Sequence, residues 1–127
     1  MLQKVEIIGY LGDDPELRYF PDGTPVVNFS VAAHRTWTNP ETGEKEDETT
    51  WFRVAAWDKQ AEAIEAHLRR GSLVRVEGRL RPDPQTGGPR IFKRPGGMFG
   101  AAYEVVAGHV LFLRSGQPRE DEEEAPL

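Results

Sequence analysis

Cysteine is absent from the 127-residue chain, which excludes disulfide bonds, thiol redox chemistry and cysteine-ligated zinc. No apolar run approaches the roughly 18 residues that a membrane-spanning helix needs. The first residues also lack an apolar stretch of signal-peptide length, so we expect a cytoplasmic protein. Neither glycine-rich phosphate loop of nucleotide-binding enzymes, GxxxxGK[ST] or GxGxxG after a strand, occurs in the chain.

Catalytic and metal-binding patterns are also scarce. The three histidines, His34, His67 and His109, are scattered and form no pair at i, i+4 spacing that would suggest a metal site. The acidic cluster at residues 13–16 precedes a proline-containing turn, and we expect it to face solvent. We therefore expect a protein that is not an enzyme and that needs no cofactor and no metal.

The charge is distributed unevenly. The net charge of −5 argues at first against a nucleic-acid partner, but residues 115–127 hold five acids and one base and carry −4 of it. Residues 36–50 carry another −4, whereas residues 69–94 hold eight bases and two acids and carry +6. A run of acids this dense repels itself, so we expect a disordered tail that either solubilises the protein or binds a partner.

Alternating apolar and polar residues predict five strands, at Val5–Gly9, Val26–Ala33, Trp51–Trp57, Leu73–Leu80 and Ala102–Leu113. A helix is predicted from Lys59 to Arg70, with Asp58 as its N-cap and Gly71 at its end. This order predicts an all-β, five-stranded oligonucleotide-binding (OB-fold) Greek-key barrel with one helix between strands three and four. The alternative is a small open antiparallel sheet with the helix packed on it.

Two connections are long. Trp37 to Thr50 is expected to be a hairpin loop that projects from the barrel, with Trp37 at its base. Residues 82–100 are rich in glycine and proline and are interpreted as a second extended loop with a short strand at Arg90 to Lys93. Long loops in compact domains are more often functional than inert. We expect one domain at residues 1–114 and a short acidic tail at residues 115–127.

The predicted third strand has two different faces. Phe52, Val54 and Ala56 suit a barrel core, whereas Trp51, Arg53 and Trp57 share the outward surface. The fourth strand adds outward arginines, at Arg75, Arg79 and Arg81. Aromatic rings interleaved with arginine are suited to single-stranded nucleic acid, because bases stack on the rings and cations follow the phosphates. The alternative is that the two indoles are buried elsewhere in the protein or in a subunit contact.

Several segments together resemble a known family. MLQKVEIIGYLGDDPELRYFPDGTPVVNFSVA, WTNPETGEKEDETTWFRVAAW, LRRGSLVRVEGRL and YEVVA resemble bacterial single-stranded DNA-binding proteins, in order over residues 1–113. The resemblance implies an OB-fold that assembles as a homotetramer and binds single-stranded DNA without sequence preference. It also implies a role in protecting that DNA during replication, recombination and repair. The alternative is an OB-fold paralogue that acts as a primosome accessory or RNA-binding module.

The resemblance assigns the family's base-stacking aromatics to Trp37, Trp51 and Trp57, and its strand-one lysine to Lys4. A fourth aromatic of the family would fall near Gln85, and Phe92 is a candidate substitute. Residues 93–102 form an insertion of about ten residues relative to the family pattern. The predicted DNA-binding residues are Lys4, Arg35, Trp37, Trp51, Arg53, Trp57, Arg75, Arg79, Arg81, Phe92, Lys93 and Arg94.

The end of the chain resembles the family's acidic tip, which closes in Pro-Phe and docks on replication and repair enzymes. Here the tip closes in leucine after a penultimate proline, and leucine offers less contact area than a phenylalanine ring. We expect docking to be weaker for that reason. The predicted partner-binding residues are Glu122, Glu123, Glu124, Pro126 and Leu127.

Overall fold

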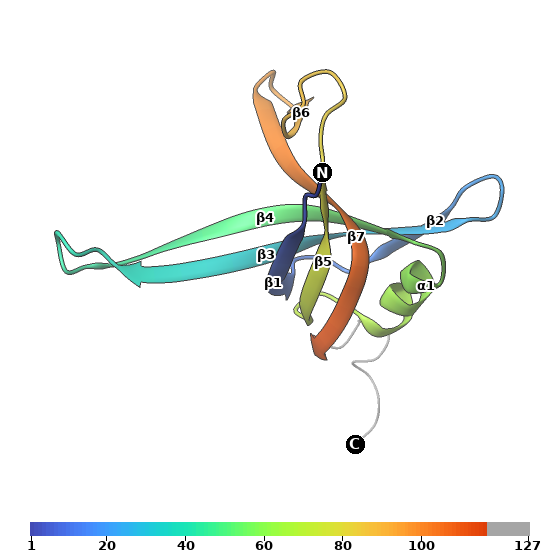
Figure 1. The fold of residues 1–127 in the computed structure, drawn as a ribbon, viewed down its shortest axis with the longest axis horizontal. Helices are drawn as coiled ribbons and strands as arrows, with labels where there is room; N and C mark the ends of the chain where they lie inside the picture. Colours follow the sequence, from blue (N-terminus) through green and yellow to red (C-terminus); the bar gives the residue numbers. More distant parts are fainter. Residues whose placement is uncertain (117–127) are drawn as a thin grey trace.

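Five strands close into a barrel in the computed structural model, which describes residues 1–116 (Figure 1). Around the barrel the hydrogen-bonded order is β1-β5-β7-β4-β3, and β1 pairs with β3 at Tyr10 and Leu11 to close it. The strands are β1 Val5–Leu11, β3 Pro25–Thr38, β4 Lys45–Trp57, β5 Leu73–Arg81 and β7 Phe99–Arg114. The predicted five-stranded barrel with one helix is confirmed, and the open-sheet alternative is wrong.

The barrel core is formed by alternate residues of each strand. Val27, Phe29 and Val31 of β3 are fully buried, and the register sets Phe29 directly opposite the buried Val54 of β4. Helix α1, Asp58–His67, lies mainly against β3 and adds Ala61 and Ile64 to this core. The helix therefore completes the core with Ala61 and Ile64. The outward side chains of β4 are described below.

Both ends of the predicted helix need correction. The helix ends at His67 rather than Arg70, because Leu68 turns to an extended backbone and is 1% exposed in the core. Trp57 occupies the N-cap position without a side-chain cap, so the assignment of Asp58 as N-cap was wrong. Asp58 is instead the first helical residue, with a φ of 60°, in the left-handed region that aspartate tolerates better than most residues.

Strands β3 and β4 are longer than predicted and form a hairpin that projects far beyond the barrel (Figure 1). Pairing continues from Val26↔Trp57 to Thr38↔Lys45, so Trp37 lies in a strand and only the tip is a turn. The predicted pairing and projection of this hairpin agree with the structure, but the predicted loop at residues 37–50 was too long, because the turn is confined to residues 39–44. Apolar alternation could not reveal this extension, because most of its side chains are solvent-exposed and no face of it is buried in a core.

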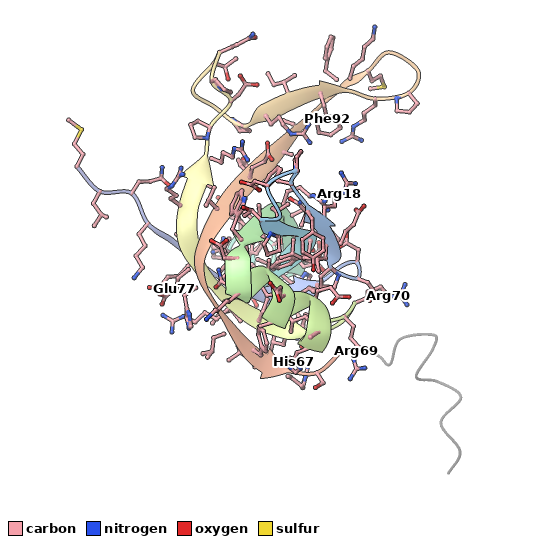
Figure 2. The ribbon with its side chains drawn as sticks, turned by 90° about the vertical axis from the view of Figure 1, so that its right-hand side faces the viewer. Arg18, His67, Arg69, Arg70, Glu77 and Phe92 are labelled. Atoms are coloured by element: carbon pink, nitrogen blue, oxygen red, sulfur yellow. The ribbon has the colours of Figure 1, made fainter. Side chains whose placement is uncertain are left out.

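Two short strands lie outside the barrel. Strand β2, Glu16–Tyr19, pairs with the start of β3 and was not predicted, since only Leu17 among its residues is partly buried. Strand β6, Arg90–Lys93, agrees with the predicted short strand and pairs with residues 99–102 at the start of β7. We call residues 82–102 the arm. It stands away from the barrel and carries Phe92 (Figure 2).

The end of β7 is fastened to the barrel beyond Arg114. The Gly116 amide donates to Ser72 Oγ at 3.0 Å, and Ser72 is fully buried. From residue 117 onward the predicted acidic tail lies outside the described residues, and so do Glu122, Glu123, Glu124, Pro126 and Leu127. Within residues 1–116, no helix is long and apolar enough to cross a membrane.

The core position of Phe29 generates a stability prediction. Phe29→Ala should lower the free energy of unfolding by about 3–5 kcal/mol, because a fully buried ring is replaced by a cavity. Urea denaturation followed by circular dichroism measures this change. Phe99→Ala is the matched control, since Phe99 is 72% exposed and its loss should cost little. Equal effects of the two variants would contradict this description of the core.

Candidate nucleic-acid interface

The outer face of β4 carries two indoles and a guanidinium. Trp51, Arg53 and Trp57 alternate with the buried Val54 and Ala56, so they point away from the core. Trp51 is 55% exposed, whereas Trp57 is half-buried. The predicted division of this strand into a core face and an outward face agrees with the structure.

Strand register brings arginines of β5 onto the same face. Reading across four strands, Ser30 lies beside Arg53, Arg53 beside Glu104, and Glu104 beside Arg81. The neighbouring row places Arg79 at the same level as Ala55 of β4. Arg79 and Arg81 therefore share the outer surface with the tryptophans of β4, as the sequence predicted.

A hollow of about 280 Å³ lies at the Trp57 end of this face. Trp57 and Arg81 line it together with Arg18, Tyr19 and Phe20, which come from β2 and the turn after it. Tyr19 and Phe20 are 62% and 47% exposed. These residues were not predicted, although an aromatic pair directly before a Pro-Asp-Gly turn is a visible signal in the sequence.

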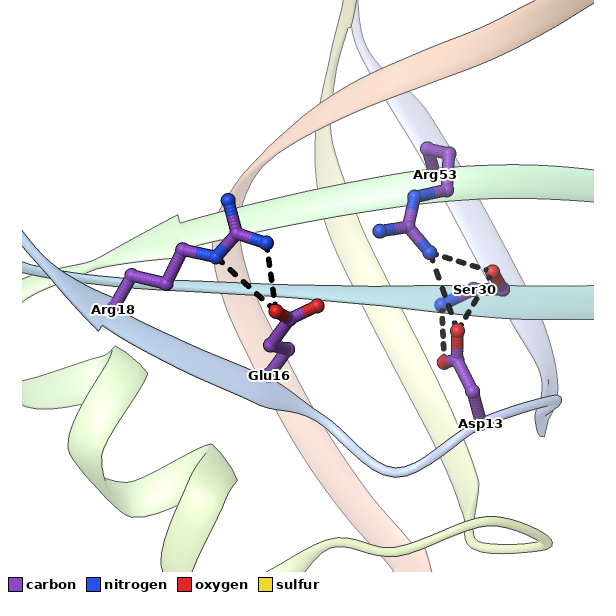
Figure 3. Close-up of polar contacts among 5 residues, drawn as sticks. All are labelled: Asp13, Glu16, Arg18, Ser30 and Arg53. Atoms are coloured by element: carbon purple, nitrogen blue, oxygen red, sulfur yellow. Dashed lines mark hydrogen bonds and ion pairs between the residues drawn. The ribbon is translucent and has the colours of Figure 1, made fainter.

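Arg53 is held by a polar network from the turn between β1 and β2 (Figure 3). Its Nη1 donates to Asp13 Oδ2 at 3.2 Å and to Ser30 Oγ at 2.9 Å. The Asp13 carboxylate also accepts from the Ser30 amide at 2.9 Å. The Asp13 side chain is 46% exposed, in line with the expectation that it faces solvent, but it also fastens the turn to β3 and orients Arg53, which was not predicted.

Nearby, Arg18 and Glu16 form a second pair, with Nη2 to Oε1 at 2.7 Å (Figure 3). The hydrogen bond and positive charge of Arg18 lower the pKa of the Glu16 carboxyl below its ordinary value. Arg18 therefore lies close to the hollow with its charge partly neutralised by a neighbouring carboxylate.

Trp37 lies apart from the other two tryptophans. Alternation along β3 puts it on the face of the hairpin opposite to the one that carries Trp51, because Trp51 pairs with Ala32 and Trp37 pairs with Glu46. The Arg35 guanidinium lies 4.9 Å from the Trp37 ring centroid and 3.4 Å from a Glu48 carboxylate oxygen. The structure therefore provides aromatic-plus-arginine groups on both faces of the hairpin.

The arm carries another aromatic group between two cations. The guanidinium groups of Arg90 and Arg94 lie 5.3 Å and 5.6 Å from the Phe92 ring centroid. Arg90 Nε also contacts Glu104 Oε1 at 2.9 Å, and Glu104 belongs to the row that contains Arg53 and Arg81. This ion pair connects the Phe92 face of the arm to the outer face of the barrel.

Lys93 points to the other face of the arm, since it neighbours Phe92 in the strand and pairs with Phe99. Gln85, near which the resemblance places the family's fourth aromatic residue, lies in the turn before β6, and its backbone N–H donates to Asp83 Oδ1 at 2.8 Å. Among the predicted residues of the arm, Phe92 and Arg94 therefore share a face and Lys93 does not.

Arg75 and Lys4 lie elsewhere on the barrel. Arg75 Nη2 is 2.8 Å from both Glu6 and Glu77 carboxylate oxygens, and Lys4 Nζ is 3.6 Å from Glu6. The hydrogen bond and charge of Arg75 lower the pKa of the Glu6 carboxyl. In return, the hydrogen bond and charge of Glu6, with the charge of Glu77, raise the pKa of the Arg75 guanidinium. Arg81 lies six positions after Arg75 in β5, a distance of roughly 20 Å along a strand. The structure does not bring Arg75 and Lys4 to the tryptophan face of β4.

The sequence matches the model of the Single-strand binding protein family over residues 2–113, which is nearly all of the part described above. The chain belongs to this family. The helix between the third and fourth barrel strands and the long β3–β4 hairpin lie within the matched residues, and so does the barrel except for Arg114, the last residue of β7.

Two relatives in the single-strand binding protein family are similar in sequence. The chain is 48% identical over 80 residues to "Single-stranded DNA-binding protein 1" of Xylella fastidiosa, covering 63% of the chain and 59% of that protein. It is 38% identical over 112 residues to "Single-stranded DNA-binding protein" of Neisseria meningitidis serogroup A, covering 88% and 60%. The chain thus spans about three-fifths of the length of these curated relatives.

Solved structures of the family have the same fold. The Plasmodium falciparum SSB complex with ssDNA superposes with a TM-score of 0.71 at 25% identity, covering 89% of this chain and 96% of that one. A deletion mutant of the single-stranded DNA binding protein from Thermus aquaticus superposes with a TM-score of 0.67 at 27% identity, covering 89% and 51%. Each superposition covers 89% of the chain, which identifies the five-stranded barrel as an OB-fold.

Proposed function

We propose that this protein binds single-stranded DNA without sequence preference and protects it during replication, recombination and repair. The observation that carries the proposal is the outer face of β4, where Trp51 and Trp57 flank Arg53 on the same surface as Arg79 and Arg81 of β5. The relative from Plasmodium falciparum, whose structure includes single-stranded DNA, adds support from the same fold.

Binding on this face uses stacking and charge. Each base that stacks on an indole contributes about 1–3 kcal/mol, and every base offers such a face, so no sequence is preferred. Within residues 1–116, Arg79 and Arg81 make no ion pair, which leaves their charges available for phosphates. No covalent bond is made or broken in this function, so we assign no enzymatic activity.

The arm extends the same path. Phe92, with Arg90 and Arg94 beside its ring, supplies the stacking group that Gln85 does not provide. The Arg90–Glu104 ion pair connects this group to the row that contains Arg53. A single strand of DNA bound along β4 can therefore continue onto the arm. Trp37 and Arg35 offer it a further contact on the other face of the hairpin.

We also propose that the protein assembles with itself, as a homotetramer. The outer face of β1, β5 and β7 exposes apolar side chains: Ile8 at 58%, Tyr10 at 44% and Leu111 at 43%. Ile8 and Leu111 flank Arg75 on this face. Exposed apolar patches of this kind favour protein association. Burial of this face between two copies of the chain would also cover the ion pairs of Arg75 and Lys4.

The remaining parts of the proposal concern organisation and partners. We assign residues 1–114 to one OB-fold domain, and residues 115–127 to an acidic tail that recruits replication and repair proteins. A cytoplasmic, nucleoid-associated location follows from the proposed DNA ligand. The glutamine at position 85 and the arm favour, as a second candidate, a paralogue that acts as a primosome accessory or RNA-binding module.

Titration with oligo(dT) should quench tryptophan fluorescence, because bases would stack on Trp51 and Trp57. Trp51→Ala and Trp57→Ala should each weaken binding by about 1–3 kcal/mol, the value of one stacked base.

The affinity for oligo(dT) should fall as the salt concentration rises, with a log–log slope of about −0.7 for each phosphate contacted. Titration of oligo(rU) in parallel distinguishes the RNA-binding candidate.

An absence of quenching at micromolar protein and low salt would overturn the proposed function. Unchanged affinity in folded tryptophan variants would instead show that the indoles are structural. Tighter binding of oligo(rU) than of oligo(dT) would favour the second candidate.

The arm provides a matched pair of phenylalanines on opposite faces. Phe92→Ala should weaken binding of long oligo(dT) by about 1–3 kcal/mol through the loss of one stacking group. Phe99→Ala, on the other face of the same arm, should leave affinity unchanged. Fluorescence titration of both variants measures the difference, and equal effects would show that the arm does not bind DNA through Phe92.

Ile8→Lys should dissociate the assembly, because it places a charge in the centre of the exposed apolar patch. Sedimentation velocity should show wild-type protein at four times the chain mass and the variant at a lower mass. Ile91→Lys, at an equally exposed isoleucine on the arm, is the control and should leave the assembly intact. A wild-type monomer would refute the proposed assembly.

A further inference from the structure

Gly12 lies in the turn between β1 and β2, directly against the indole of Trp51. A Cβ atom added to Gly12 would lie 2.8 Å from Trp51 Cη2 and closer still to Cζ3, a separation that real Cβ atoms essentially never show. The backbone does not require glycine here, since Gly12 is not among the glycines with positive φ. The side chain is therefore excluded by the ring of Trp51 and not by the turn.

The turn has little freedom to move away from the ring. The Gly12 amide donates to the Ser30 carbonyl at 3.0 Å, and the adjacent Asp13 carboxylate accepts from the Ser30 amide at 2.9 Å. Asp13 also holds Arg53, which faces Ser30 across the β3–β4 pair (Figure 3). The next outward pair along the same hairpin is Ala32 and Trp51. One hydrogen-bonded network therefore fixes both the turn and the strand position that carries the indole.

We propose that Gly12 is a positioning residue for Trp51 in the binding of single-stranded DNA. The benzene half of the indole lies in space that any side chain at position 12 would occupy, so the ring is held against the turn before DNA arrives. Trp51 remains 55% exposed as a residue, so its indole is available to a base. Holding it in advance reduces the side-chain entropy that stacking would otherwise cost. This inference rests on the proposed function, and it adds to the DNA-binding residues a glycine that has no side chain of its own.

The test compares Gly12→Ala with Gly108→Ala in an oligo(dT) fluorescence titration. Gly12→Ala should weaken binding about three- to tenfold, a part of the value of one stacked base. Gly108→Ala should bind as wild type, because its added Cβ would meet only the Glu77 carbonyl oxygen, at an ordinary 3.6 Å. In a Trp51→Ala background Gly12→Ala should cause no further loss, since the ring that it displaces is gone.

A second readout does not depend on DNA. In protein that retains only Trp51, through Trp37→Phe and Trp57→Phe, Gly12→Ala should make the free protein's fluorescence more sensitive to acrylamide. An unchanged sensitivity would overturn the proposal even if DNA binding itself failed. Failure of the wild-type protein to bind oligo(dT) would instead overturn the proposed function and leave this readout intact.

Two further results would overturn the positioning role: wild-type affinity in Gly12→Ala, or an equal loss in the presence and absence of Trp51. If Gly12→Ala alone fails to fold, the double variant with Trp51→Ala decides. Recovery of folding would show that residue 12 acts through the ring, and unfolding of both would show a role in the turn alone.

Discussion

The pairing of β3 with β4 is the constraint on which the rest of the structure depends. Phe29 opposite Val54 anchors its register in the core, and the two strands remain paired from Val26 to Thr38. Since side chains alternate, a slip of one residue would bury Trp51 and Arg53 and expose Val54. The hydrophobic core therefore determines, through the strand register, which residues of β4 face outward, among them Trp51 and Arg53.

The sequence predicted those parts of the fold in which one face is buried. The barrel strands and the core side of β4 were readable because apolar residues alternate there. The outer hairpin was not readable, since it lacks a buried face, and Trp37 was therefore placed in a loop and not on the face opposite Trp51. Asp13 was missed because its partners Ser30 and Arg53 are 17 and 40 residues away, which no local pattern reveals.

The acidic residues of the barrel serve a purpose beyond solubility. Asp13 orients Arg53, and Glu104 orients Arg90, each through contacts at or below 3.2 Å. Ion pairs this exposed add little stability, but they restrict the directions in which the guanidinium groups point. Two carboxylates thus lie within the candidate interface, where each holds an arginine in place. Among the described residues, Arg79 and Arg81 have no carboxylate partner of this kind.

The projecting hairpin, with an indole on each of its faces, has a mechanical consequence. A nucleic acid that contacts both Trp37 and Trp51 has to turn around the edge of the hairpin, from one face of the two paired strands to the other. Duplex DNA, with a persistence length of about 50 nm, resists such a turn, and its bases are already stacked on each other. The protein would then discriminate between single-stranded and duplex DNA through the stiffness of the duplex. It would need no side chain that recognises one form directly.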